Sequence, residues 1–149
     1  MSIINRLFGR RPSVPVADIE HPALGTLQWD GDIGFWRMTR KEPSAGGSIP
    51  VCLWGDAKQG PSDQAIALIL PHINELPMLV QASRNYLANE LSIKSKRLVG
   101  GAELALCDIC AYATKKPYMD VTFEWPEKPD WILRVSLENG RPDGWGFDD

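Results

Sequence analysis

The sequence predicts an α+β domain with about six mainly antiparallel strands, three before and three after a central kinked helix or helix pair that packs on one sheet face. Three observations lead to this expectation. Between Pro61 and Leu91, apolar residues recur every three or four positions, which is the helical period. On both sides of that stretch, apolar and polar residues alternate with the period of two typical of half-buried strands. Gly, Pro and Asp-Gly pairs separate these runs, as turns do.

Residues 1–20 are expected to form a basic amphipathic arm and linker that precedes a single α+β domain over residues 21–149. The first 17 residues contain three arginines and no acidic residue. Arg11-Pro12 ends any helix there, because the residue before a proline avoids the helical region. We expect the arm to pack on its own domain or on a second copy of the chain. Weak docking on a membrane surface or a partner is the alternative.

The first strands are expected to form a hairpin. Leu27 and Trp29 alternate with polar neighbours, and the turn signal Asp-Gly-Asp follows at residues 30–32. The partner strand is expected over residues 33–39, and a third strand over residues 49–54.

The central helical stretch begins with a good capping sequence. Ser62 is a favourable N-cap residue, and Asp63 in the first turn suits the helix dipole. Pro71 and Pro77 complicate the helix, because each removes a hydrogen bond and clashes with the preceding turn. We therefore expect either one kinked helix or two helices that meet near residues 72–76.

The last predicted hairpin has a defined register. Closing the loop after Trp125 places the large apolar residues opposite one another: Trp125 and Trp131, Phe123 and Leu133, Val121 and Val135, Met119 and Leu137. A slip by one residue would put Thr122 or Arg134 into the core, so the alternation specifies this pairing. Extending the pattern upstream, Ala105, Cys107, Ile109 and Ala111 are expected to face Trp125, Phe123, Val121 and Met119.

The pair Cys107 and Cys110 has the C-x-x-C spacing of redox and zinc motifs. A redox pair needs its first thiol at a helix N-terminus, whereas this pair lies within an alternating strand and is expected to point to opposite faces. A zinc site needs further ligands, and the rest of the chain offers Cys52, His21 and His72. The sequence therefore predicts no metal site and no cofactor, with Cys107 in the core and Cys110 on the other face.

Motifs for catalysis and phosphate binding are absent from the sequence, which contains neither a nucleophile elbow nor a glycine-rich phosphate loop. The polar face of the last hairpin is expected to be exposed to solvent, with ordinary charge pairing between its strands. Arg134 is expected to lie opposite Thr122 and diagonal to Asp120 and Glu124. We therefore predict no catalytic residue. An enzyme site near the helix break at His72 is the less favoured alternative.

Composition narrows the classes of partner. The net charge is −3, and residues 18–149 carry 13 basic and 19 acidic residues, which argues against nucleic acid as a partner. No apolar run approaches the ~20 residues of a membrane span. Three cysteines, an odd number, and no signal-peptide pattern predict a cytoplasmic protein.

Six tryptophans are unusual for 149 residues. Trp29, Trp125 and Trp131 fall on predicted core faces. Trp36, Trp54 and Trp145 are the candidate partner surface, because tryptophan is enriched at binding hot spots. Exposure beside apolar neighbours would mark such a surface.

The segment from His21 to Trp29, the mid-chain helix and the closing Asn-Gly-Arg-Pro-Asp-Gly-Trp tail are together similar to small bacterial α+β domains of unknown function. Some of those domains resemble the immunity proteins of polymorphic toxin systems. The resemblance implies a protein-binding role and assigns no functional residue. We therefore expect a non-enzymatic protein-binding module, immunity-like or an adaptor. A homo-oligomer with a structural role is the alternative.

Overall fold

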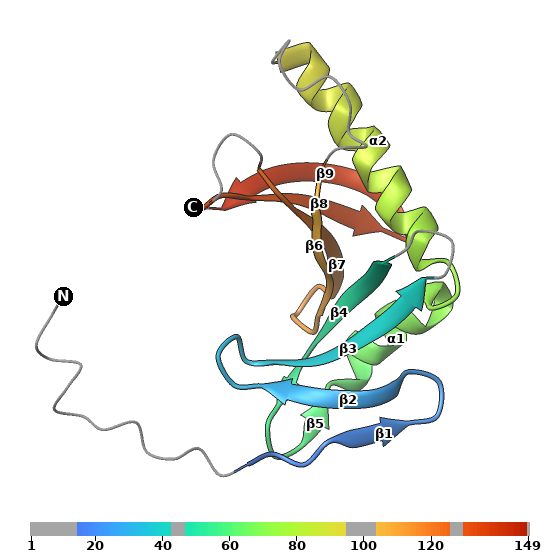
Figure 1. Ribbon diagram of the computed structural model, residues 1–149, viewed down its shortest axis with the longest axis vertical. Helices are drawn as coiled ribbons and strands as arrows, with labels where there is room; N and C mark the ends of the chain where they lie inside the picture. Colours follow the sequence, from blue (N-terminus) through green and yellow to red (C-terminus); the bar gives the residue numbers. More distant parts are fainter. Residues whose placement is uncertain (1–14, 43–46, 95–103, 126–129, 149) are drawn as a thin grey trace, which may run out of the picture.

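The computed structural model describes residues 15–42, 47–94, 104–125 and 130–148, and the predicted arm over residues 1–14 lies outside this part of the chain. The described residues form one curved sheet with two helices and a short 3-10 turn against its convex face (Figure 1). The strands are β1 (Ile19–His21), β2 (Gly25–Asp30), β3 (Phe35–Glu42), β4 (Gly47–Asp56), β5 (Gly60–Pro61), β6 (Leu106–Tyr112), β7 (Tyr118–Glu124), β8 (Ile132–Glu138) and β9 (Arg141–Asp148).

The strand order is β1-β2-β3-β4-β6-β7-β8-β9, with β5 paired to β4. Every pairing is antiparallel except that of β4 with β6, which is parallel. A parallel neighbour needs a crossover, and the helices between β4 and β6 supply it. The parallel β4–β6 pair thus joins the N-terminal and C-terminal strands into one sheet.

The predicted α+β domain with six strands is therefore wrong, since the described chain is mainly a nine-stranded mixed sheet with short helices. β1 and β5 have three and two residues, too few to show an alternation. β9 contains Pro142, Gly144 and Gly146, for which the sequence predicts a glycine-rich tail and not a strand. Backbone hydrogen bonds to β8 hold it in the sheet, and these do not depend on its side chains.

The central helical stretch consists of two separate helices. α1 (Asp63–Ile69) begins at Ser62, whose hydroxyl accepts a hydrogen bond from the Gln64 N–H, and the 3-10 turn η2 (Leu70–His72) follows it. α2 (Leu76–Lys94) starts beside Pro77, so the break lies where the prolines predicted it. Of the described helices, none is long and apolar enough to span a membrane by itself; α1–η2 and α2, bent by 86°, meet that criterion of length and composition only as a pair.

The core lies between the helices and the convex face of the sheet. It includes Val51 of β4, Ile109 of β6 and Phe123 of β7, together with Ile69 of α1 and Leu87 of α2, all fully buried. The predicted pairing of the last hairpin is confirmed, with Phe123 opposite Leu133, Val121 opposite Val135 and Met119 opposite Leu137.

The predicted register upstream of that hairpin is only partly correct. Ile109 and Ala111 do lie opposite Val121 and Met119, but Leu106 and not Cys107 lies opposite Phe123. A β-bulge between Leu106 and Asp108 inserts one extra residue into β6. In a β-bulge, two residues of one strand lie opposite a single residue of the neighbouring strand, so the alternation of side chains between the two faces breaks at that point.

Candidate functional site

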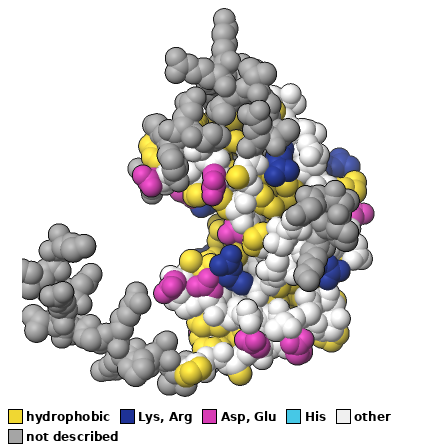
Figure 2. All heavy atoms as spheres, viewed as in Figure 1, with side chains coloured by type: hydrophobic (Ala, Val, Ile, Leu, Met, Phe, Trp, Pro, Cys, Tyr) yellow, Lys and Arg dark blue, Asp and Glu magenta, His cyan; other side chains and the backbone are white. Residues whose placement is uncertain are grey.

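The face of the sheet that points away from α1 and α2 is concave, and we call it the concave face. The helices contact β4, β6, β7 and β9 from the opposite side. Figure 2 shows a hollow in the molecular surface on the side where the sheet opens, with acidic and basic side chains around it. The side chains that line this face come from alternate positions of the neighbouring strands β2, β3, β4, β6, β7, β8 and β9.

One row of side chains on the concave face is aromatic. Phe35, Trp54, Tyr112 and Tyr118 lie on the adjacent strands β3, β4, β6 and β7, and we call them the aromatic row. The ring centroids of Phe35 and Tyr112 are 5.6 Å apart, and those of Tyr112 and Tyr118 stack at 4.6 Å. Trp54 is 43% exposed and contacts both Phe35 and Tyr112. The row is thus a continuous aromatic surface with an accessible indole.

The next rows hold thiols and carboxylates. Cys52 and Cys110 lie directly opposite each other on the parallel strands β4 and β6. Asp108 precedes Cys110 by two positions and projects from the same face. Its carboxylate oxygens lie 3.7 Å from the Cys52 Sγ and 3.5 Å from the Cys110 Sγ. One ligand atom from each residue lies within 4.8 Å of the others, a spacing that a metal ion could bridge.

Cys107 is not the core residue that the alternation predicted. The bulge in β6 moves it out of line with Phe123, and its side chain is partly exposed, within hydrogen-bonding reach of Thr122. Burial is the main cause of the raised pKa of this thiol, with Asp108 and Glu124 adding to it. The expected position of Cys110 on the other face from the core is confirmed.

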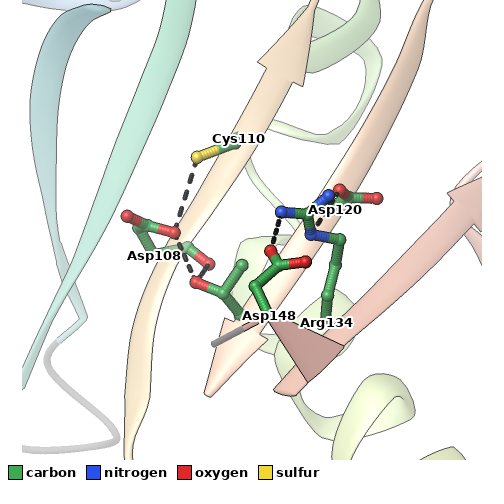
Figure 3. Close-up of polar contacts among 6 residues, drawn as sticks. Asp108, Cys110, Asp120, Arg134 and Asp148 are labelled. Carbon is green, nitrogen blue, oxygen red and sulfur yellow. Dashed lines mark hydrogen bonds and ion pairs between the residues drawn. The ribbon is translucent and has the colours of Figure 1, made fainter. Parts of the chain in front are cut away.

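Thr122 and Asp120 belong to this site and are not solvated, contrary to the sequence interpretation. Asp120 is fully buried and Thr122 is 7% exposed. The Thr122 hydroxyl donates a hydrogen bond of 2.5 Å to the Asp108 carboxylate. Figure 3 shows Asp108 beside Cys110, and Arg134 between Asp120 and Asp148. Arg134 lies opposite Thr122 as predicted and forms ion pairs with Asp120, at 3.3 Å, and with Asp148. The curvature of the sheet brings these side chains together, and period-two patterning does not reveal that curvature.

The environment of Asp120 predicts a pH-dependent effect of its replacement. Burial raises the pKa of Asp120 above its ordinary value, although Ser136 and Arg134 act in the opposite direction. A raised folded-state pKa means that folding favours the protonated form, so this group contributes most stability below its unfolded pKa and loses that contribution as the pH rises. Asp120→Asn, which is neutral at every pH, should therefore be more stable than the wild type at pH 7.

Urea unfolding at pH 7 and pH 4 measures this difference, which should shrink at pH 4. Arg134 keeps Asp148 as a partner in the variant. A variant less stable than the wild type at neutral pH would show that the ion pair outweighs the cost of burial.

The histidines do not lie on the concave face. His21 Nδ1 accepts hydrogen bonds from the backbone N–H groups of Ala23 and Leu24, which is a structural role in a turn. His72 lines a pocket of about 530 Å³ that Tyr118, Glu138 and Asp143 also line. Within the described part of the chain, no hydrogen bond joins the His72 imidazole to either carboxylate. Among the described residues, the structure thus shows no orienting partner for His72 of the kind that a general base uses.

The three candidate tryptophans differ in how far their side chains are exposed. Trp36 is 1% exposed, and its Nε1–H donates to the Asp56 carbonyl, so it is a core residue. Trp145 is partly buried and packs against the core. Trp54 alone of the three is exposed beside apolar neighbours.

Comparisons of the chain with protein-family models, with curated proteins and with solved structures found no match.

Proposed function

We propose that the protein is a non-enzymatic binding module that holds a basic segment of a partner protein on its concave face. The observation that carries this proposal is the exposed Trp54 within the aromatic row. Tryptophan and tyrosine supply large contact areas at little conformational cost, which is why they dominate binding hot spots. An immunity-like role is one form that such binding can take.

The charges of the concave face favour a basic partner. Among the described residues of this face, the carboxylates of Asp30, Asp108, Asp120, Glu124 and Asp148 outnumber the guanidinium groups of Arg37 and Arg134. Both arginines are already paired with carboxylates. An arginine or lysine of the partner could stack on the Trp54 indole and reach the partly exposed Asp108 or the exposed Glu124. Such attraction would weaken with salt.

Trp54→Ala is expected to weaken binding at least tenfold, since it removes the accessible anchor of the aromatic row. The partner would first be captured from a lysate of the source organism with tagged protein, at low and at moderate salt. Its affinity for the wild type and the variants would then be measured by calorimetry, and cross-linking would locate the bound segment. Met78→Ala is the matched control, because Met78 is 67% exposed on α2, away from the concave face.

The proposal requires that Met78→Ala binds as the wild type does and that the cross-linked segment is rich in lysine or arginine. Equal affinity of Trp54→Ala and the wild type would contradict it. Capture of only further copies of this chain would favour the homo-oligomer instead.

A further inference from the structure

We propose that Cys52, Asp108 and Cys110 bind one Zn²⁺ ion on the concave face, with the fourth coordination position left to water or to a ligand atom of a bound molecule. Asp108 also belongs to the acidic residues of the proposed protein-binding face, but metal binding does not depend on that role and is tested without a partner.

The sheet brings the three ligands together. Cys52 and Cys110 occupy the same register of the parallel β4–β6 pair, so their thiols leave the same face side by side. Asp108 lies two positions before Cys110 and therefore projects from that face beside them. The two sulfur atoms lie within 4.8 Å of each other, and both thiols lie within hydrogen-bonding distance of the Asp108 carboxylate.

The distances fit a tetrahedral ion. Zinc–sulfur bonds of about 2.3 Å and zinc–oxygen bonds of about 2.0–2.2 Å set ligand atoms roughly 3.5 Å apart along the sulfur–oxygen edge of a tetrahedron. The observed sulfur–oxygen distances are 3.7 Å for Cys52 and 3.5 Å for Cys110. Zinc could enter this cluster with little movement of the three side chains.

The donor set selects the metal. Two thiolates disfavour Mg²⁺ and Ca²⁺, which prefer oxygen ligands, and a carboxylate disfavours Cu⁺, which prefers sulfur. Zn²⁺ accepts both sulfur and carboxylate oxygen. Cys52 is fully buried and Cys110 is 7% exposed, whereas Asp108 is only partly buried and lies on the open side. The fourth position would therefore face the hollow of the concave face.

Neighbouring residues support the ligands. The Thr122 hydroxyl donates to the Asp108 carboxylate at 2.5 Å and so orients it. Arg37 lies directly opposite Cys52 on β3. Its pKa is raised mainly by the hydrogen bond with Asp30, with further contributions from Cys52 and Asp108. Two thiolates, one carboxylate and Zn²⁺ carry a net charge of −1, which this guanidinium would offset.

Titration with Co²⁺ and then Zn²⁺ tests the site. Full-length protein without a histidine tag would be treated with a chelator, reduced with a phosphine and titrated with Co²⁺. We expect one Co²⁺ per chain, with thiolate-to-cobalt charge-transfer absorption that stoichiometric Zn²⁺ abolishes. Zn²⁺ should also raise the melting temperature of the reduced protein.

Single substitutions assign the ligands. Cys52→Ser and Cys110→Ser should each abolish the charge-transfer band or reduce Co²⁺ affinity at least tenfold, and Asp108→Asn should weaken binding. Cys107→Ser is the matched control, because this thiol lies next to the cluster in sequence but outside it, and it should bind Co²⁺ as the wild type does. Far-ultraviolet circular dichroism verifies that each variant is folded.

The proposal is overturned if the reduced wild type binds no Co²⁺ or Zn²⁺ stoichiometrically, including the case in which Cys52 and Cys110 only form a disulfide under oxidising conditions. It is also overturned if Cys107→Ser loses the metal while Cys52→Ser keeps it. If a cysteine variant does not fold, the metal stoichiometry of the wild type and the metal affinity of Asp108→Asn decide whether the proposal stands.

Discussion

Phe123→Ala should lower the free energy of unfolding by about 3–5 kcal/mol, the range typical for truncation of a buried aromatic residue. Phe123 is fully buried in β7 and lies opposite Leu106 on one side and Leu133 on the other. The Arg84 guanidinium of α2 lies 5.7 Å from the centroid of its ring. Truncation would leave a cavity where the helix meets the sheet, and the strands on both sides are held too firmly to close it.

Urea unfolding of the wild type and of Phe147→Ala provides the comparison. Phe147 is 49% exposed on β9 and stacks on Trp131, so its truncation should cost less than about 1 kcal/mol. The same substitution, phenylalanine to alanine, should therefore lower the free energy of unfolding much more at the buried position than at the exposed one. Similar losses in the two variants would be inconsistent with β7 as the centre of the core.

The position of Phe123 could be predicted from the sequence because its hairpin alternates large apolar and polar residues without interruption. Shifting the strands by one residue would bury Arg134, which makes the correct register far more stable than its neighbours. The helix break was predictable for a similarly local reason, since proline cannot continue a helix. Both predictions depend on residues close together in the chain.

The rest of the sheet depends on pairings that no local pattern reveals. β1 and β5 are too short to show a period, and β9 pairs through its backbone while carrying glycine and proline. The parallel β4–β6 pair joins segments on either side of the helices. The sequence of a strand does not indicate which other strand it will pair with. The α+β expectation failed because these pairings extend one sheet across the whole described chain.

The candidate site was missed for the same reason. The C-x-x-C spacing directed attention to Cys107 and Cys110, whereas the thiol that meets Cys110 is Cys52, on β4. Asp108-x-Cys110 was the available signal, because residues two apart share a strand face. This signal indicates a site only once the β4–β6 pairing is known, because that pairing brings Cys52 beside Asp108 and Cys110. The bulge that displaces Cys107 adds one residue to β6 and was likewise not visible in the alternation.

Gly55→Ala should destabilise the fold by about 2–3 kcal/mol, in the upper range for overpacking. A Cβ at Gly55 would lie 2.5 Å from the Gly60 carbonyl oxygen, 2.7 Å from the Pro61 Cα and 2.9 Å from the Trp36 Cδ1. Two of these atoms belong to the backbone of β5, which cannot rotate away as a side chain can. The Ser62 N–H donates to the Trp54 carbonyl at 2.8 Å next to this contact, so the connection to α1 would be disturbed as well.

Gly144→Ala on β9 is the matched control, because a Cβ there meets no atom within 4 Å. Replacing a glycine with alanine also restricts the unfolded chain, which stabilises the fold by about 0.4–1 kcal/mol where the backbone permits it. That contribution is common to both variants, so the difference between their unfolding free energies isolates the clash at Gly55. If both variants unfolded at the same urea concentration, β5 could not lie as close to β4 as the structure places it. The start of α1 at Ser62 would then need a support other than this strand pair.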